Sequence, residues 1–174
     1  QFMIVCTAGL TALAGCSGSD LPTTNESEPS TTAENKLRNE IVETTNAATV
    51  DFAQADRELG SAQVLSSDEK WERAAESAGN AVDAFADAED KFRTAISRAE
   101  ELGNLEIENM LEEYEGASST GGEVSTLVKE GCELVIDGDT DSAQSRFEEV
   151  EERRTELQDY DLASESELNS AIRS

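Results

Sequence analysis

The chain of 174 residues carries 39 acidic and 13 basic side chains, which give it a formal net charge of −26. This length suits one domain with appendages, and so acidic a chain repels the phosphates of nucleic acids and anionic lipid head groups. Histidine is absent, which excludes the commonest general base and imidazole metal sites.

The first segment is an uncharged, mostly apolar run over residues 1–15 that ends at Cys16. It is too short to span a bilayer, which takes about 20 residues, and it has the length of a signal-peptide core. Its end, Leu13-Ala14-Gly15-Cys16, resembles a lipobox, in which a small-residue cleavage site directly precedes a cysteine. The resemblance implies removal of residues 1–15 and a diacylglyceryl group on Cys16, whose two acyl chains anchor a protein stably. The alternative is a buried or membrane helix that contains a cysteine by chance.

No positive charge precedes this run, so we expect further residues upstream of Gln1. Gln1-Phe2-Met3-Ile4 is similar to the end of a twin-arginine signal, although the two arginines are not in this sequence. We therefore predict an exported protein that is anchored by lipid to the outer face of the cell membrane.

Residues 16–33 follow the cleavage site, are rich in serine, threonine and acid, and contain both prolines of the chain. This composition predicts a flexible, solvated linker that holds the next domain away from the membrane. Asn25-Glu26-Ser27 matches the N-glycosylation sequon, and Asn25 would be accessible in such a linker. A chance match to so short a pattern is the alternative.

An acidic helical domain is predicted over residues 34–174, and its first helix carries an apolar stripe from Leu37 to Leu59. Gly60-Ser61 is expected to end or loosen this helix, and Ser66 with Glu69 matches a capping box for the next one. The apolar residues of the second helix alternate at spacings of four and three, which is typical of coiled-coil packing. They are Trp71, Ala75, Ala78, Val82, Phe85, Phe92, Ile96 and Ala99.

The third helix is predicted to follow a stop at Leu102-Gly103-Asn104 and to extend from Leu105 to Val135. The glycine-rich segment 116–122 leaves two alternatives. We favour one long, weakened helix; otherwise a loop splits it, and Thr120 with Glu123 caps a new helix.

Asp137-Gly138-Asp139 predicts a turn, and a short final helix is predicted over residues 164–173. Between them, the apolar residues of a fourth helix are Ala143, Phe147, Val150 and Leu157. Long helices with short connections favour antiparallel neighbours. We therefore predict an all-α fold: an elongated antiparallel bundle of three to four long amphipathic helices with a thin, alanine-rich core.

A weak candidate for calcium binding lies at the start of the fourth helix. Oxygen-bearing side chains occupy positions 1, 3, 5, 9 and 12 of an EF-hand-like loop, namely Asp137, Asp139, Asp141, Ser145 and Glu148. Ser142 replaces the glycine of position 6, and a turn in which Thr140 or Asp139 caps a helix is the favoured interpretation. We therefore predict no metal and no other cofactor.

The same region resembles half of a tetratricopeptide repeat at Gly131, Gly138, Ala143 and Phe147, which would imply a peptide-binding or scaffold role. No second copy is in register, so a generic helical hairpin is the favoured interpretation. Cys132 near the apolar face is expected to be a small buried hydrophobe. No phosphate loop or nucleophile elbow is present, so we predict no catalytic residues and no enzymatic activity.

The excess of acid with only four lysines resembles that of halophilic archaeal proteins, and with the lipobox the chain resembles a small acidic haloarchaeal lipoprotein. This resemblance implies folding at high salt, where a crowded acidic surface barely repels itself. Smooth amphipathic helices favour a surface-anchored, non-enzymatic interaction or scaffold module with a protein partner. The alternative is a ligand- or cation-binding accessory module of a transporter or envelope complex.

Overall fold

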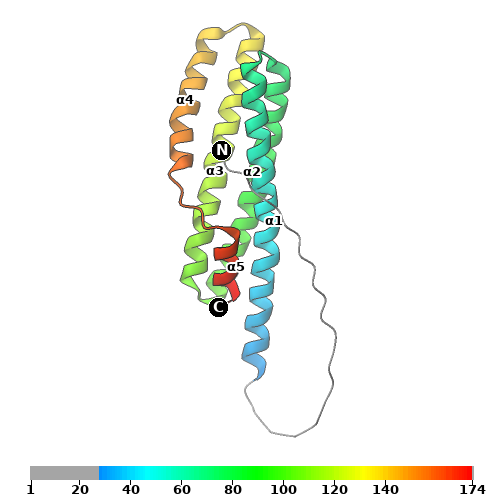
Figure 1. The fold of residues 1–174 in the computed structure, drawn as a ribbon, viewed down its shortest axis with the longest axis vertical. Coiled ribbons are helices and arrows are strands. Elements are labelled where there is room, and N and C mark those ends of the chain that lie inside the picture. The colour runs from blue at the N-terminus through cyan, green and yellow to red at the C-terminus, as the bar shows by residue number, and fades with distance from the viewer. Residues whose placement is uncertain (1–27, 174) are drawn as a thin grey trace.

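The computed structural model describes residues 28–173 as helices joined by short connections, with no strand in that range (Figure 1). The helices are α1 Glu28–Ser67, α2 Trp71–Leu102, α3 Leu105–Asp137, α4 Thr140–Gln158 and α5 Glu165–Arg173. The prediction of an all-α fold is therefore confirmed. Within the described range, no helix combines the length and the apolar character needed to cross a membrane.

Three predictions from the sequence concern residues before α1. The predicted signal peptide, the lipidated Cys16 and the sequon at Asn25 all lie outside the described residues. The predicted linker extends to residue 33, whereas α1 begins at Glu28, so its last six residues belong to the first helix.

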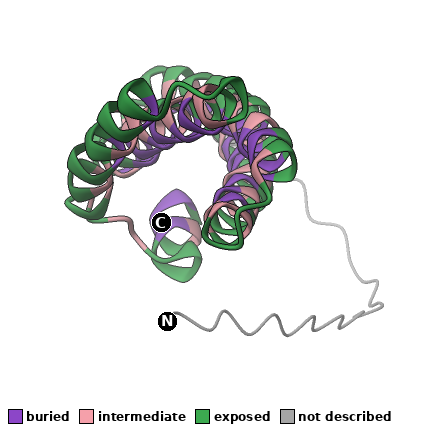
Figure 2. Cartoon of the chain, turned by 90° about the horizontal axis from the view of Figure 1, so that it is seen from above, coloured by how far each residue is buried: buried purple, intermediate pink, exposed green. Residues whose placement is uncertain are grey.

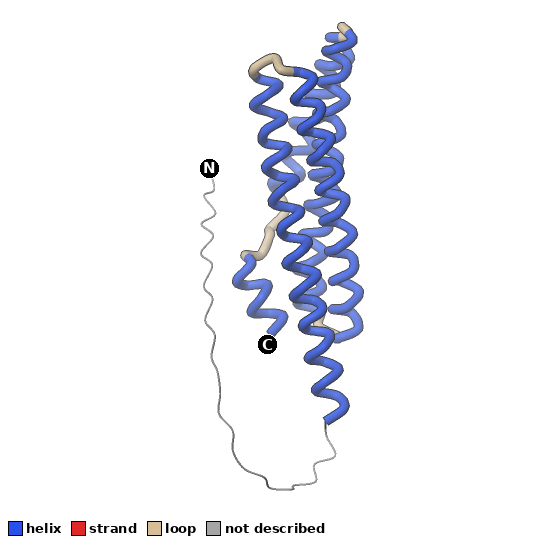
Figure 3. Tube along the Cα trace, turned by 90° about the vertical axis from the view of Figure 1, so that its right-hand side faces the viewer, coloured by secondary structure: helices blue, strands red, loops and turns tan. Residues whose placement is uncertain are grey.

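The helices α1, α2 and α3 run antiparallel and side by side along most of the molecule (Figures 1 and 3). Along one half of α3 packs α4, and beside its other half lies α5, between α3 and α1. Seen from above, the first four helices form an arc with a concave buried face, and α5 lies at its open side (Figure 2). As described, no Cα atom of α1 comes within 8 Å of one of α4, so the arc does not close.

The core is thin and rich in alanine, as the sequence predicts. Buried alanines along α2 let the neighbouring backbones approach closely, and they are Ala74, Ala75, Ala78, Ala81, Ala84, Ala88, Ala95 and Ala99. The core has two clusters, one around Phe85 in the half that contains α4 and one around Phe92 in the half that contains α5. Phe52 joins them, because its ring centroid lies 5.5 Å from that of Phe85 and 5.9 Å from that of Tyr114.

Two predicted helix ends are confirmed and have simple local causes. Gly103 and Gly138 adopt φ angles of 72° and 83°, a left-handed conformation that glycine reaches without steric cost. The next helix in each case begins with a polar cap. Asn104 accepts hydrogen bonds from backbone N–H groups of α3, and Asp139 accepts one from Ser142 in α4.

Replacing Asn104 with alanine is expected to lower the free energy of unfolding by about 1 kcal/mol. Its side-chain oxygen accepts hydrogen bonds from the N–H groups of Glu106 and Ile107, both at 3.2 Å, and alanine leaves these donors unpaired. Chemical denaturation in molar KCl measures the loss. The matched control is Asn109→Ala, an exposed position inside α3 where alanine only improves helix propensity. Equal losses in both variants would show that the cap is unimportant.

Of the two alternatives at Gly60-Ser61, an end of the first helix is wrong, because α1 continues to Ser67. Leu59 and Ala62 on either side are buried against α2, and this packing outweighs the low helix propensity of one exposed glycine. The capping box of Ser66 with Glu69 is also wrong. The Ser66 hydroxyl donates to the carbonyl of Gln63 at 2.9 Å, and α2 begins after Lys70 with no side-chain cap.

The glycine-rich segment 116–122 does not break α3, which confirms the favoured alternative of one long helix. Here and further along α3, glycines leave room for aromatic rings of neighbouring elements. A Cβ atom added to Gly116 would lie 2.8 Å from the ring of Tyr160, and one on Gly121 would lie 2.6 Å from that of Phe85. One on Gly131 would lie 2.7 Å from the ring of Phe147. The glycines are thus required by packing between elements rather than by a turn.

Candidate functional site

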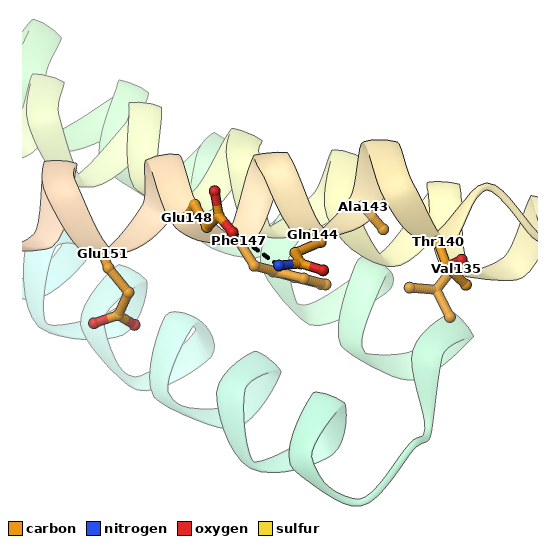
Figure 4. A pocket seen from close by; sticks show the side chains of 7 residues that line it. All are labelled: Val135, Thr140, Ala143, Gln144, Phe147, Glu148 and Glu151. Atoms are coloured by element: carbon orange, nitrogen blue, oxygen red, sulfur yellow. Dashed lines mark hydrogen bonds between the residues drawn. The ribbon is translucent and has the colours of Figure 1, made fainter.

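Two pockets lie on the open side of the arc, along one face of α4. They begin near the first residues of α5 and continue away from that helix. The first, of about 420 Å³, lies between α1 and α4, and its walls include Phe52, Leu59 and Gln63 of α1 with Arg154 and Leu157 of α4. The second, also of about 420 Å³, continues along α4 and includes Ala143, Gln144, Phe147, Glu148 and Glu151 (Figure 4). These two pockets together are called the α1–α4 groove.

The floor of the groove is apolar, and aromatic contacts hold its side chains in place. Phe147 can approach α3 closely because Gly131 has no side chain there, and its ring centroid lies 6.2 Å from that of Trp71. Both rings remain partly exposed, as does Leu157 further along α4. Apolar surface is therefore left open on this side of the core.

The rim of the groove is acidic. Asp56 of α1 and Glu148 and Glu151 of α4 are exposed carboxylates, and the Gln144 side chain donates to Glu148 at 2.9 Å. Figure 4 shows Glu151 extending from α4 toward the neighbouring helix. Arg154 crosses the groove and donates to the side-chain oxygen of Gln63 at 3.0 Å. This hydrogen bond spans α4 and α1, whose backbones do not meet.

The weak calcium candidate is not assembled as a metal loop. Asp139 accepts hydrogen bonds from the N–H and the hydroxyl of Ser142, and these hold the pKa of its carboxyl below its usual range. Because α4 begins at Thr140, the backbone that would wrap an ion is already helical, so Asp137, Asp141 and Glu148 do not converge with Asp139. Among the described residues, no group of three or more ligating side chains could hold a metal ion.

Shifted carboxyl groups elsewhere have the same local character as Asp139. Lys70 lowers the pKa of Asp68 through a hydrogen bond and its charge, and hydrogen bonds from Ser164 lower that of Glu167. Both side chains are exposed, and Ser164 with Glu167 forms a reciprocal cap at the start of α5. These shifts belong to turns and helix ends.

Cys132 is fully buried in α3, where desolvation, with a smaller contribution from the charge of Glu133, raises its pKa from 9.0 to about 11. We expect native protein at pH 8 to resist maleimide labelling at Cys132, because the thiolate is the reactive form. Protein unfolded in guanidinium at the same pH should react rapidly, as mass spectrometry of the Cys132 peptide would show.

The same shift has a consequence for stability. The unfolded thiol loses its proton near pH 9 while the folded one keeps it, so this contribution is constant below pH 9 and declines between pH 9 and about 11. In Cys132→Ala that decline should be absent. Rapid labelling of the native protein at pH 8 would contradict the buried thiol.

Sequence reasoning did not find the groove. The sequence gives Ala143, Phe147, Val150 and Leu157 as the apolar residues of the fourth helix. In the structure Ala143 and Val150 are buried, whereas Phe147 and Leu157 are only partly so. The spacings of four, three and seven residues give a narrow stripe that one or two neighbouring helices could cover, so the sequence carries no signal of the groove. Comparison of the chain with family models, curated proteins and solved structures gave no match.

Proposed function

We propose that this chain is an exported lipoprotein, held at the outer face of the cell membrane by lipid on Cys16, whose helical domain is a non-enzymatic interaction module. The observation that carries the interaction role is the α1–α4 groove. It places partly exposed apolar side chains, including Phe147 and Leu157, inside a rim of carboxylates. An apolar patch with a polar rim is typical of surfaces that bind other proteins.

The anchor is supported by the lipobox and by the composition that follows it. A Ser- and Thr-rich segment separates Cys16 from α1, so lipid on Cys16 would leave the acidic domain clear of the bilayer. Two acyl chains are sufficient for stable anchoring, whereas the acidic domain itself has no affinity for anionic head groups.

The anchor is tested by mass spectrometry of the mature N-terminus and by fractionation of cells. We expect a diacylglyceryl modification on Cys16 and release of the Cys16→Ser variant from the membrane into the medium. Cys132→Ser is the matched control and should stay with the membrane, because its thiol is buried in the domain. A Cys16→Ser variant that remains in the membrane fraction would refute the anchor.

The interaction role is tested by photo-crosslinking in living cells at their native salt concentration. A photoreactive residue is placed in turn at Gln158 in the groove, at Asn80 on α2 and at Asn109 on α3, all of which are exposed. We expect covalent adducts with one discrete partner protein from at least one position. The absence of adducts from every position, with a monomer in native salt, would argue against an interaction module.

A further inference from the structure

The lower half of the concave face, which is the half that contains α5, is covered by a short helix of the chain itself. There α5, an amphipathic helix, closes the opening between α1 and α3 with Leu168 and Ile172, which are 1% and 0% exposed. These two anchors are four residues apart and therefore share one face of the helix. Arg38 of α1 donates to the carbonyl of Ile172 at 2.6 Å and fixes the end of α5.

The upper half of the same face has no such helix among the described residues. Leu162, just before α5, lines both the α1–α4 groove and the pocket beside α5, so the groove adjoins the start of α5. Along it, Phe52, Phe147 and Leu157 stay partly exposed. In the core cluster that contains α5, by contrast, Ile41, Ile107 and Leu111 are buried. Within residues 28–173, a short helix thus covers half of the concave face, and no helix covers the other half.

The acidic side chains around the open half indicate the charge of a partner that would bind there. Asp56, Glu148 and Glu151 line the groove, and Arg154 is the cation among its lining residues. Arg154 donates to Gln63 across the groove and lies 3.8 Å from Glu151, so it neutralises little of this rim. Its side chain has to turn away from Gln63 before a helix can lie between α1 and α4. At molar salt only charges in direct contact interact strongly, so lysines or arginines placed against these carboxylates would be favoured over acidic side chains such as those of a second copy of this chain.

We propose that the α1–α4 groove binds one amphipathic helix of a partner protein, with apolar anchors four residues apart and flanking lysines or arginines, placed end to end with α5. The wall from Phe52 to Gln63 is about 16 Å long at 1.5 Å per residue, which accommodates roughly three helical turns. This inference rests on the proposed interaction module and names the class of its partner. It is the helix-in-groove mode of recognition.

Binding is tested with synthetic peptides of roughly twelve residues, which is about three helical turns. The probe has leucines on one face and lysines beside them, and contains no tryptophan. One control has the same composition with the leucines spread around the helix, and the other has glutamate in place of lysine. The protein is the full chain with Cys16→Ser, at the lowest KCl concentration at which circular dichroism shows native helix content.

Trp71 can report binding through its neighbour, because it is the only tryptophan of the chain and its ring centroid lies 6.2 Å from that of Phe147, which lines the groove. We expect a saturable change in Trp71 fluorescence with the probe, and affinities weaker by about tenfold or more for both controls. Equal binding of the scrambled peptide would reveal non-specific charge attraction and would overturn the inference. Equal binding of the glutamate peptide would overturn the choice of a basic partner.

Variants locate the binding site. Leu157→Asp in the groove should weaken probe binding by about tenfold, whereas Leu105→Asp, at an apolar residue that is 69% exposed outside the groove, should not. The double variant Glu148→Gln with Glu151→Gln keeps the apolar floor and should lose part of the preference for lysine over glutamate. Parent-level probe affinity in both Leu157→Asp and this double variant would overturn the inference. The double variant keeps every apolar contact of the groove, so it remains a test if Leu157→Asp fails to fold.

The outcomes separate this inference from the proposed function. A photo-crosslinked partner captured from Asn80 or Asn109 but never from Gln158 would leave the interaction module standing and refute the groove as its site. Sedimentation that shows a dimer dissociated by Leu157→Asp would mean that a second copy fills the groove, which also refutes a basic partner. No partner from any position would refute the interaction module, while peptide binding would still report the chemistry of the groove.

Discussion

The variant Gly121→Ala is expected to lose about 2 kcal/mol of stability, although alanine is the better helix former. An added Cβ atom would lie 2.6 Å from two ring atoms of Phe85, well inside normal contact distance. The ring is 1% exposed at the centre of the α4-side core cluster, so it cannot move away without shifting α1 or α2. The clash therefore outweighs the gain in helix propensity of about 1 kcal/mol.

The matched control is Gly60→Ala, also a helical glycine with φ below zero. Nothing lies within 4 Å of the Cβ position of Gly60, so alanine there should raise the free energy of unfolding by up to about 1 kcal/mol. Both variants are measured by chemical denaturation in molar KCl. Equal changes of the same sign in the two variants would show that the contact with Phe85 has no energetic role.

Lowering the salt concentration is expected to unfold the domain. At 1 M KCl the Debye length is about 3 Å, and at 0.1 M it is about 10 Å, so neighbouring carboxylates repel one another only in dilute buffer. Asp51, Glu58, Asp83 and Asp87 line one pocket between α1 and α2, and the contact of Lys91 with Asp51 relieves only part of this crowding. A melting temperature that stays the same from multimolar KCl to 0.1 M would contradict the prediction.

The electrostatic cause can be separated from the general effect of salt on apolar burial. Replacing Asp83 and Asp87 together with asparagine should move the unfolding midpoint to lower KCl concentration, because two like charges leave the pocket between α1 and α2. Asn80→Ser changes an uncharged residue of the same pocket and should leave that midpoint in place. If all the variants had the same midpoint, strengthened apolar burial would explain the salt effect instead.

The helical class and several boundaries of this fold were predictable, because they depend on local chemistry. Gly103 and Gly138 end helices through their own conformational freedom, and Asn104 and Asp139 cap the next ones with their own side chains. The predictions of helix boundaries that are wrong concern places where packing against a distant element determines the backbone conformation. Gly60 stays helical because its neighbours pack against α2, and no local pattern contains that information.

The candidate site was not predictable for a related reason. Helical spacing places Phe147 and Leu157 on the apolar face of α4, but it cannot tell whether one neighbour or two will cover that face. The answer depends on how far α4 stands from α1, and that distance is set by the packing of the whole arc. Lipidation of Cys16 and glycosylation at Asn25 stay predictions from the sequence.

The glycines of α3 that contact aromatic rings also fix how the neighbouring helices are aligned along α3. Surfaces made mostly of alanine are smooth, so two such helices can slide past each other by one turn and still bury similar area. Tyr160 from the segment after α4, Phe85 from α2 and Phe147 from α4 each fit only where a glycine of α3 lies opposite. A slip along α3 would press rings against side chains at several places at once. A few glycines thus give an otherwise repetitive interface a single alignment.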